Sequence, residues 1–151
     1  MATAYDIPAE KLVPRLAEEL KKLDTVKAPE WAMFVKTGRH KEKSPIDEGW
    51  WFVRSAAVLR KVYLDGPIGT TRVAAAFGGK ADRGSKPNKA VRGSRAIARM
   101  TIQQLEKSQL IQRDKDGGRV VTGKGRKLVD GLSTELLKEM AVQNPELTKY
   151  L

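Results

Sequence analysis

The chain has no cysteine, and His40 is the only histidine among its 151 residues. The absence of cysteine excludes disulfides, thiol nucleophiles and cysteine-ligated zinc. A single histidine cannot by itself supply a metal site or a Ser-His-Asp triad. His40 stands among Arg39, Lys41 and Lys43 in a polar linker, so we interpret it as a surface residue.

Long apolar runs and secretory patterns are also missing. No segment approaches the roughly 20 apolar residues of a transmembrane helix. The N-terminal residues lack the basic and then apolar pattern of a secretory signal. We therefore expect a soluble intracellular protein.

No group of residues has the spacing of a catalytic site. Asp114 and Asp116 fall in an expected turn, where aspartate is favoured for backbone reasons, so we do not interpret them as a metal pair. The glycine-rich pieces 66–69 and 122–127 lack the strand and helix context of a phosphate-binding loop. The sequence predicts a binding protein that is not an enzyme and needs no cofactor, metal or small-molecule substrate.

Positive charge is abundant and concentrated in the middle of the chain. The protein has 29 Lys and Arg against 18 Asp and Glu, a net charge of +11 and a pI near 10.0. Residues 1–30 carry a net charge of −1 and residues 128–151 a net charge of −2, so the cationic excess lies between Lys36 and Lys127. Such a balance predicts attraction to nucleic acid or to an anionic membrane.

The most basic stretch, 77–100, contains a single acid, Asp82. Its first part is rich in Gly, Pro, Ser and Asn, which predicts an exposed loop over 78–93 that is mobile when free. Its second part predicts a helix over 94–108, capped by Ser94, on which arginines recur at helical spacing. The side of that helix expected to be buried consists of Ala98, Thr101, Ile102 and Leu105. A cationic loop that leads into a cationic helix favours a partner with phosphates along a path. The basic residues are Lys80, Arg83, Lys86, Lys89, Arg92, Arg95 and Arg99.

Apolar spacing predicts two helices before this stretch. The first has Asp6 as a cap and an apolar stripe of leucines, and Pro14 is expected to kink it or delay its start. The second covers about 49–64, is capped by Asp47, and buries one strongly apolar face. That face consists of Trp51, Ser55, Val58 and Val62.

The remaining pattern predicts a winged helix-turn-helix domain. A short helix follows Gly69, the helix 94–108 comes next, then a β-hairpin around the turn 114–118, and a last helix over about 123–140. We interpret 94–108 as the recognition helix and the hairpin as the wing. About fifteen cationic residues replace the three or four of an ordinary turn between the two helices. Because that insertion would collide with a docked DNA duplex, it favours another nucleic acid.

Several short sequence motifs occur in a definite order over nearly the whole chain. They include Pro29-Glu30-Trp31, His40-Lys41-Glu42, Phe77-Gly78-Gly79, Arg92-Gly93-Ser94, Gln104-Leu105-Glu106 and Asp116-Gly117-Gly118-Arg119. With these motifs in this order, the chain resembles the small-subunit ribosomal protein family S19e of archaea and eukaryotes. The resemblance implies a mainly α fold: one domain over 1–151, with an N-terminal helical extension over 1–48 and a winged-helix-like core over 49–140.

The resemblance also implies a function. It predicts a structural constituent of the head of the small ribosomal subunit, located on cytoplasmic ribosomes, that binds folded small-subunit ribosomal RNA. Neighbouring ribosomal proteins, a monomeric free state and a contribution to subunit maturation are implied as well. It adds Arg54, Arg60, Lys61 and Arg119 to the candidate RNA contacts. Arg54 and Lys61 stand seven residues apart on one flank of helix 49–64, and an ordinary solvated edge explains that pair equally well.

Two other functions stay open at this point. A winged-helix transcription regulator would place helix 94–108 in a DNA major groove and would use a dimer to match two half-sites. An RNA-processing enzyme would need an acid–base or metal set that the sequence lacks. The roles of Trp31 and Trp50, as base-stacking platforms or as core, are also left open.

Overall fold

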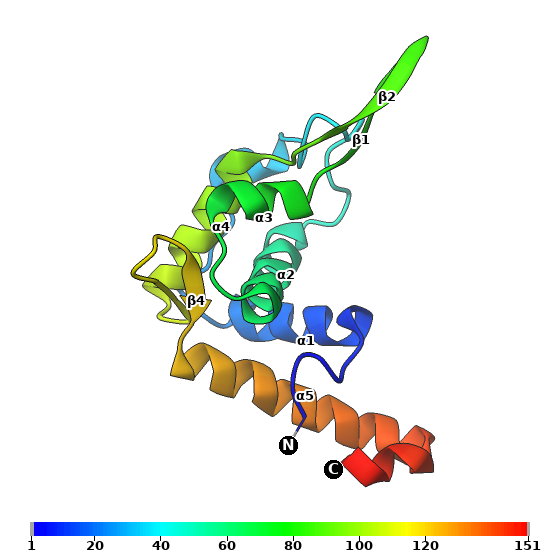
Figure 1. The fold of residues 1–151 in the computed structure, drawn as a ribbon, viewed down its shortest axis with the longest axis vertical. Helices are drawn as coiled ribbons and strands as arrows, with labels where there is room; N and C mark the ends of the chain where they lie inside the picture. The colour runs from blue at the N-terminus through cyan, green and yellow to red at the C-terminus, as the bar shows by residue number, and fades with distance from the viewer. Residues whose placement is uncertain (1, 151) are drawn as a thin grey trace.

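The computed structural model of the chain describes residues 2–150 (Figure 1). Within this range, helices form a compact body and one β-hairpin projects from it, far from both termini (Figure 1). The α-helices are α1 (Ala9–Lys21), α2 (Trp50–Asp65), α3 (Thr70–Ala76), α4 (Arg95–Lys107) and α5 (Gly123–Gln143). The 3-10 helices are η1 (Glu30–Met33) and η2 (Pro145–Tyr150). The strands are β1 (Gly79–Arg83), β2 (Lys86–Val91), β3 (Ile111–Arg113) and β4 (Arg119–Val121).

The order α2, α3, α4, β3–β4 and α5 confirms the predicted mainly α, winged-helix-like fold. The wing is the antiparallel pair β3–β4, in which Ile111 lies opposite Val121. Its turn uses Gly117 with φ +84°, a conformation that favours glycine. None of the helices in 2–150 is both long enough and apolar enough to cross a bilayer.

Helix α1 shows how an apolar stripe overrides a proline. Leu12, Leu16 and Leu20 lie four residues apart and are completely buried, so packing fixes one face of the helix. The helix starts directly after Pro8 and runs through Pro14, so the late start, one of the two effects expected of Pro14, does not occur. The predicted Asp6 cap was also wrong, because the Asp6 carboxylate accepts hydrogen bonds from the Thr3 N–H (2.7 Å) and hydroxyl (2.8 Å) instead.

Helix α2 lies at the centre of the body and buries the predicted face of Trp51, Ser55, Val58 and Val62. The predicted cap, Asp47, does not reach the helix. Its carboxylate accepts a hydrogen bond from the Gly49 N–H at 2.9 Å, and Gly49 itself is the N-cap residue. Asp47 therefore closes the turn that precedes the helix.

A polar chain ties α2 to α4 and to the segment after α1. The indole N–H of Trp51 donates to the Gln104 side-chain oxygen at 2.9 Å, and the Gln104 amide donates to the Lys27 carbonyl at 2.7 Å. Trp31 and Trp50 pack edge-on against Trp51, with ring centroids 5.7 Å and 5.4 Å away. Both rings are partly buried, so the open question about them resolves in favour of packing around Trp51.

We predict that Gln104→Ala destabilises the fold by about 1–3 kcal/mol, because it leaves the buried Trp51 N–H without its acceptor. Urea unfolding followed by far-UV circular dichroism measures the change. Gln103→Ala is the matched control on the same helix, where an exposed side chain should cost less than about 0.5 kcal/mol. Equal effects of the two substitutions would contradict this assignment.

A hydrogen bond between α2 and α5, from Tyr63 to Asp130, makes the stability of the fold vary with pH in the alkaline range. Burial, followed by the hydrogen bond of 2.7 Å to the Asp130 carboxylate, raises the pKa of Tyr63 to about 12. The phenol of the unfolded chain has a pKa of 10.0. The protonated Tyr63 side chain therefore stabilises the fold fully below that pH, and this stabilisation is lost as the pH rises toward 12. We expect Tyr63→Phe to lose less stability than wild type between about pH 10 and 12, measured by thermal unfolding. Parallel curves would refute the coupling.

Candidate nucleic-acid interface

The segment predicted as a loop forms a two-stranded antiparallel hairpin, here called the finger (β1, β2 and their turn). Lys80 lies opposite Ala90, and Arg83 lies opposite Lys86. Gly84, with φ +69°, makes the turn. The loop prediction was wrong because the finger is largely exposed on both faces. Its strands therefore lack the apolar alternation by which a half-buried strand is recognised.

The finger carries four of the predicted contact residues, and none of them is neutralised. Lys80, Arg83, Lys86 and Lys89 are all exposed, and none forms an ion pair within the described part of the chain. The register places Lys80 and Lys89 on neighbouring cross-strand pairs, and so on opposite faces. Arg83 directly faces Lys86, which is unfavourable for a free hairpin. Both faces of the finger are thus available to an anionic partner.

The base of the finger is held by direct contact between backbones. Gly93 donates to the Ala74 carbonyl at 2.8 Å, and Ser94 donates to the Thr37 carbonyl at 2.9 Å. A Cβ atom on Gly93 would lie 2.6 Å from the Phe77 carbonyl oxygen. Only glycine permits this approach, so the finger leaves the body at a fixed junction.

Helix α4 starts at that junction and confirms its predicted faces. The Ser94 hydroxyl accepts a hydrogen bond from the Ile97 N–H at 3.3 Å, as expected of an N-cap. The predicted buried side is buried, and the arginines are exposed. Arg92, Arg95 and Arg99 therefore extend the cationic surface from the finger along the first turns of α4.

The three candidates on α2 have different surroundings. The guanidinium carbon of Arg54 lies 4.4 Å from the Phe77 ring centroid, and burial lowers the pKa of this side chain. Lys61 forms a 2.8 Å ion pair with Asp65. The Nε of Arg60 is buried and makes no hydrogen bond within 2–150. Arg54 and Lys61 thus have intramolecular partners, whereas the finger cations form no ion pair within the described chain.

Arg119 lies apart from the other candidates. Its Nε contacts the Glu106 carboxylate at 2.8 Å, and its backbone pairs with Ile68. Glu106 is eleven residues beyond Arg95 on α4, which is roughly 16 Å along the helix axis. The structure brings the finger and the start of α4 together and leaves Arg119 on the wing.

His40 is placed differently from the sequence interpretation. It is partly buried under the base of the finger, where a Cβ on Gly79 would lie 2.8 Å from its Cδ2. Burial, with further contributions from Lys41 and Arg54, lowers the pKa of His40. The surface assignment was wrong, because a polar linker gives no sign that its histidine folds under a distant hairpin.

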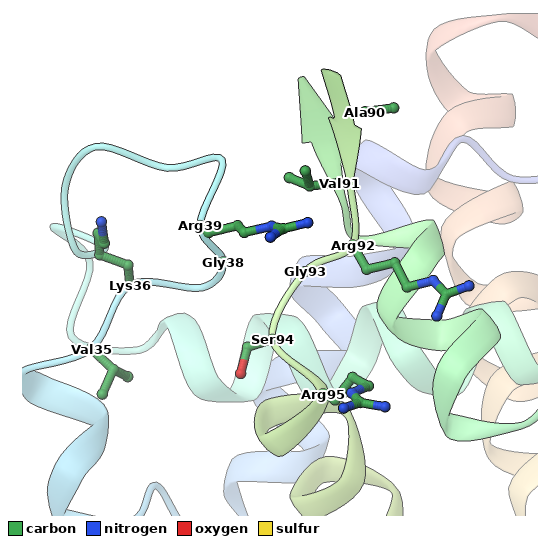
Figure 2. A pocket seen from close by; sticks show the side chains of 10 residues that line it. All are labelled: Val35, Lys36, Gly38, Arg39, Ala90, Val91, Arg92, Gly93, Ser94 and Arg95. Carbon is green, nitrogen blue, oxygen red and sulfur yellow. The ribbon is translucent and has the colours of Figure 1, made fainter. Parts of the chain in front are cut away.

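The sequence reasoning missed one feature, a groove between segments 35–39 and 90–95 (Figure 2). The groove has a volume of about 800 Å³. Its lining includes Lys36 and Arg39, which were not among the predicted contacts, as well as Arg92 and Arg95. The general charge of 36–127 was the only signal for these two residues. The described residues hold no cluster of acidic side chains or His suited to a metal ion.

We predict that Arg54→Ala lowers stability by about 0.5–2 kcal/mol, because it removes a partly desolvated cation–π contact with Phe77. Lys61→Ala, which removes an ordinary i,i+4 pair, should cost about 0.3–0.5 kcal/mol. Denaturant unfolding of both variants tests this order. A larger loss for Lys61→Ala would show that the Phe77 contact contributes little.

A sequence model described as "Ribosomal protein S19e" matches residues 3–139. The chain is 40% identical to the small ribosomal subunit protein eS19 of Aeropyrum pernix and 37% identical to that of Thermoplasma acidophilum, with 100% of each chain covered. It is 35% identical to eS19A of Schizosaccharomyces pombe over 89% of this chain and 93% of the relative. The chain therefore belongs to the ribosomal protein S19e family, whose members are structural ribosomal proteins rather than enzymes, which confirms both the resemblance and the predicted absence of catalysis.

Proposed function

We propose that this structural ribosomal protein binds small-subunit ribosomal RNA through the finger and the exposed side of α4. The observation that supports this most directly is the set of exposed cations without ion pairs in residues 2–150. They run from the finger tip to the first turns of α4 as Arg83, Lys86, Lys80, Lys89, Arg92, Arg95 and Arg99.

Electrostatics explains why a phosphate backbone suits this surface. Like charges placed opposite each other on a solvated hairpin repel, and phosphates on both sides of the finger would relieve that repulsion. Arginine can bind phosphate through two parallel hydrogen bonds. Because the major groove of duplex RNA is too deep and narrow for a helix, α4 would lie across backbones. Recognition would then depend on RNA shape rather than base identity.

The other candidates have secondary places in this proposal. Arg60 and Lys61 lie on α2, and Arg119 lies on the wing. Arg54 and Arg119 each have an intramolecular partner. In this proposal they would bind RNA only through the guanidinium N–H groups that those contacts do not use. Position in the subunit head, ribosome-bound cytoplasmic location, neighbouring ribosomal proteins, a free monomer and a role in maturation belong to the same proposal.

A DNA-binding regulator is the competing function, and the geometry disfavours it. The finger directly precedes α4 in the sequence, and it projects away from the helical body (Figure 1). Duplex DNA docked with α4 in its major groove would meet the finger at the N-terminal end of that helix, where recognition helices make base contacts.

We predict that Arg95→Glu with Arg99→Glu folds normally but enters small subunits at least about tenfold less efficiently, because two phosphate contacts become repulsive. Folding should persist because both side chains are exposed and because Arg95 is the first residue of α4, where an acid is favourable. Sucrose-gradient sedimentation of cells that express the tagged variant measures incorporation.

The charge-matched control is Lys11→Glu with Lys138→Glu. These two exposed lysines lie on α1 and α5, away from the finger (Figure 1). Incorporation should stay near that of wild type. If the arginine variant and the control enter subunits equally well, the α4 surface does not bind the RNA.

A further inference from the structure

We propose that the groove between segments 35–39 and 90–95 binds a short single-stranded segment of RNA, separately from the α4 surface. This inference rests on the proposed RNA-binding function and deepens it, since it assigns single-stranded rather than duplex RNA to a groove that the sequence reasoning missed. Lys36 and Arg39 would contact consecutive phosphates of that strand.

The floor of the groove is preformed. Gly38 and Gly93 form an antiparallel bridge, and the Ser94 N–H donates to the Thr37 carbonyl at 2.9 Å. A Cβ on Gly38 would lie 3.1 Å from the Gly93 Cα and 2.6 Å from the His40 Nδ1. Two segments distant in sequence are thus held backbone to backbone without side chains between them. A strand that enters the groove meets a rigid surface, so the protein loses little conformational freedom on binding.

The charge of the groove is of one sign. Of the ten described residues that line it, four are cationic and none is acidic. Lys36 and Arg39 are exposed and have no ion pair within the described chain. In Figure 2, Arg39 reaches from its segment toward the base of β2, whereas Arg92 and Arg95 point to the far side of their segment. Arg39 therefore reaches across the groove, Lys36 lines it on the same side, and Arg92 and Arg95 border it but face outward with α4.

Size and lining favour a single strand over a duplex. A volume of about 800 Å³ lies in the range of pockets that hold one small ligand, ~300–1,000 Å³. That is room for a few nucleotide units of one strand and not for a double helix. Val35, Ala90 and Val91 add an apolar part to the lining, against which sugar rings can pack.

An exposed aromatic residue stands beside the groove in the chain. Phe34 directly precedes the lining residue Val35, and its side chain is 81% exposed. A cationic groove combined with aromatic stacking platforms is the usual composition of sites for single-stranded nucleic acid. We assign Phe34 as the platform for one base of the bound segment.

The test measures binding of the full-length protein to a fluorescent twelve-nucleotide uridine RNA and, separately, to a twelve-base-pair RNA duplex, over a series of salt concentrations. Lys36→Ala with Arg39→Ala should weaken binding of the single strand about tenfold or more at low salt. It should also lower the slope of log affinity against log salt by about 1.4, since each phosphate contact on a single strand contributes about 0.7. Duplex affinity should change less than about threefold, because the α4 surface is intact.

The control pair, Lys11→Ala with Lys138→Ala, removes the same charge from α1 and α5. If the groove variant and the control bind the single strand equally, or if the groove variant loses duplex and single strand alike, the inference is overturned. Pyrophosphate or a glutamate oligomer of matched charge that displaces the RNA at equal concentration would also overturn it, since the site would then recognise charge alone. Failure of the proposed function itself would differ, because wild type would then bind neither RNA.

Phe34→Leu provides a readout that does not depend on charge. Loss of one stacked base should weaken binding of the uridine strand about fivefold or more and leave the salt slope unchanged. Thermal unfolding should stay near that of wild type, because the side chain is 81% exposed. Wild-type affinity for the strand would show that Phe34 does not stack, and a lowered midpoint of unfolding would show that its role is structural.

Discussion

The contact of bare backbones at Gly38 and Gly93 fixes how the cationic parts of this protein are arranged. The bridge between these residues, with the hydrogen bonds from Gly93 to Ala74 and from Ser94 to Thr37, joins the linker, the end of α3, the finger and the start of α4. A side chain at either glycine would force the segments apart. Without this junction, the same charges would lie on separate and independently moving segments.

The division of the cations follows from the same geometry. Arg54 and Lys61 on α2 contact Phe77 and Asp65, and Arg119 on the wing contacts Glu106. The cations on the finger and the start of α4 face solvent. Because partly buried charges require compensation within the fold, the first group stabilises the protein, and the second is free to bind an external anion.

The body that supports this surface depends on a small number of specific ties between helices. Trp51 is completely buried and still needs an acceptor for its indole N–H, which Gln104 provides. Gln104 in turn holds the Lys27 carbonyl, so α2, α4 and the segment after α1 are positioned together. These ties orient α4, and the orientation of α4 decides in which direction its arginines face.

The sequence by itself determined the helices, the wing and the side of α4 that is buried, because apolar residues at helical spacing and turn glycines act locally. It also located the cationic region, since charge is a property of composition. It did not determine the finger, because solvated strands lack apolar alternation. It also did not determine how the first two helices begin, because the carboxylates of Asp6 and Asp47 accept hydrogen bonds from nearer N–H groups instead of capping those helices. Only the tertiary structure decided that His40 folds under the finger and that Lys36 and Arg39 line one groove with the segment that leads into α4. Those contacts join residues about forty to sixty positions apart, and a local pattern carries no information about them.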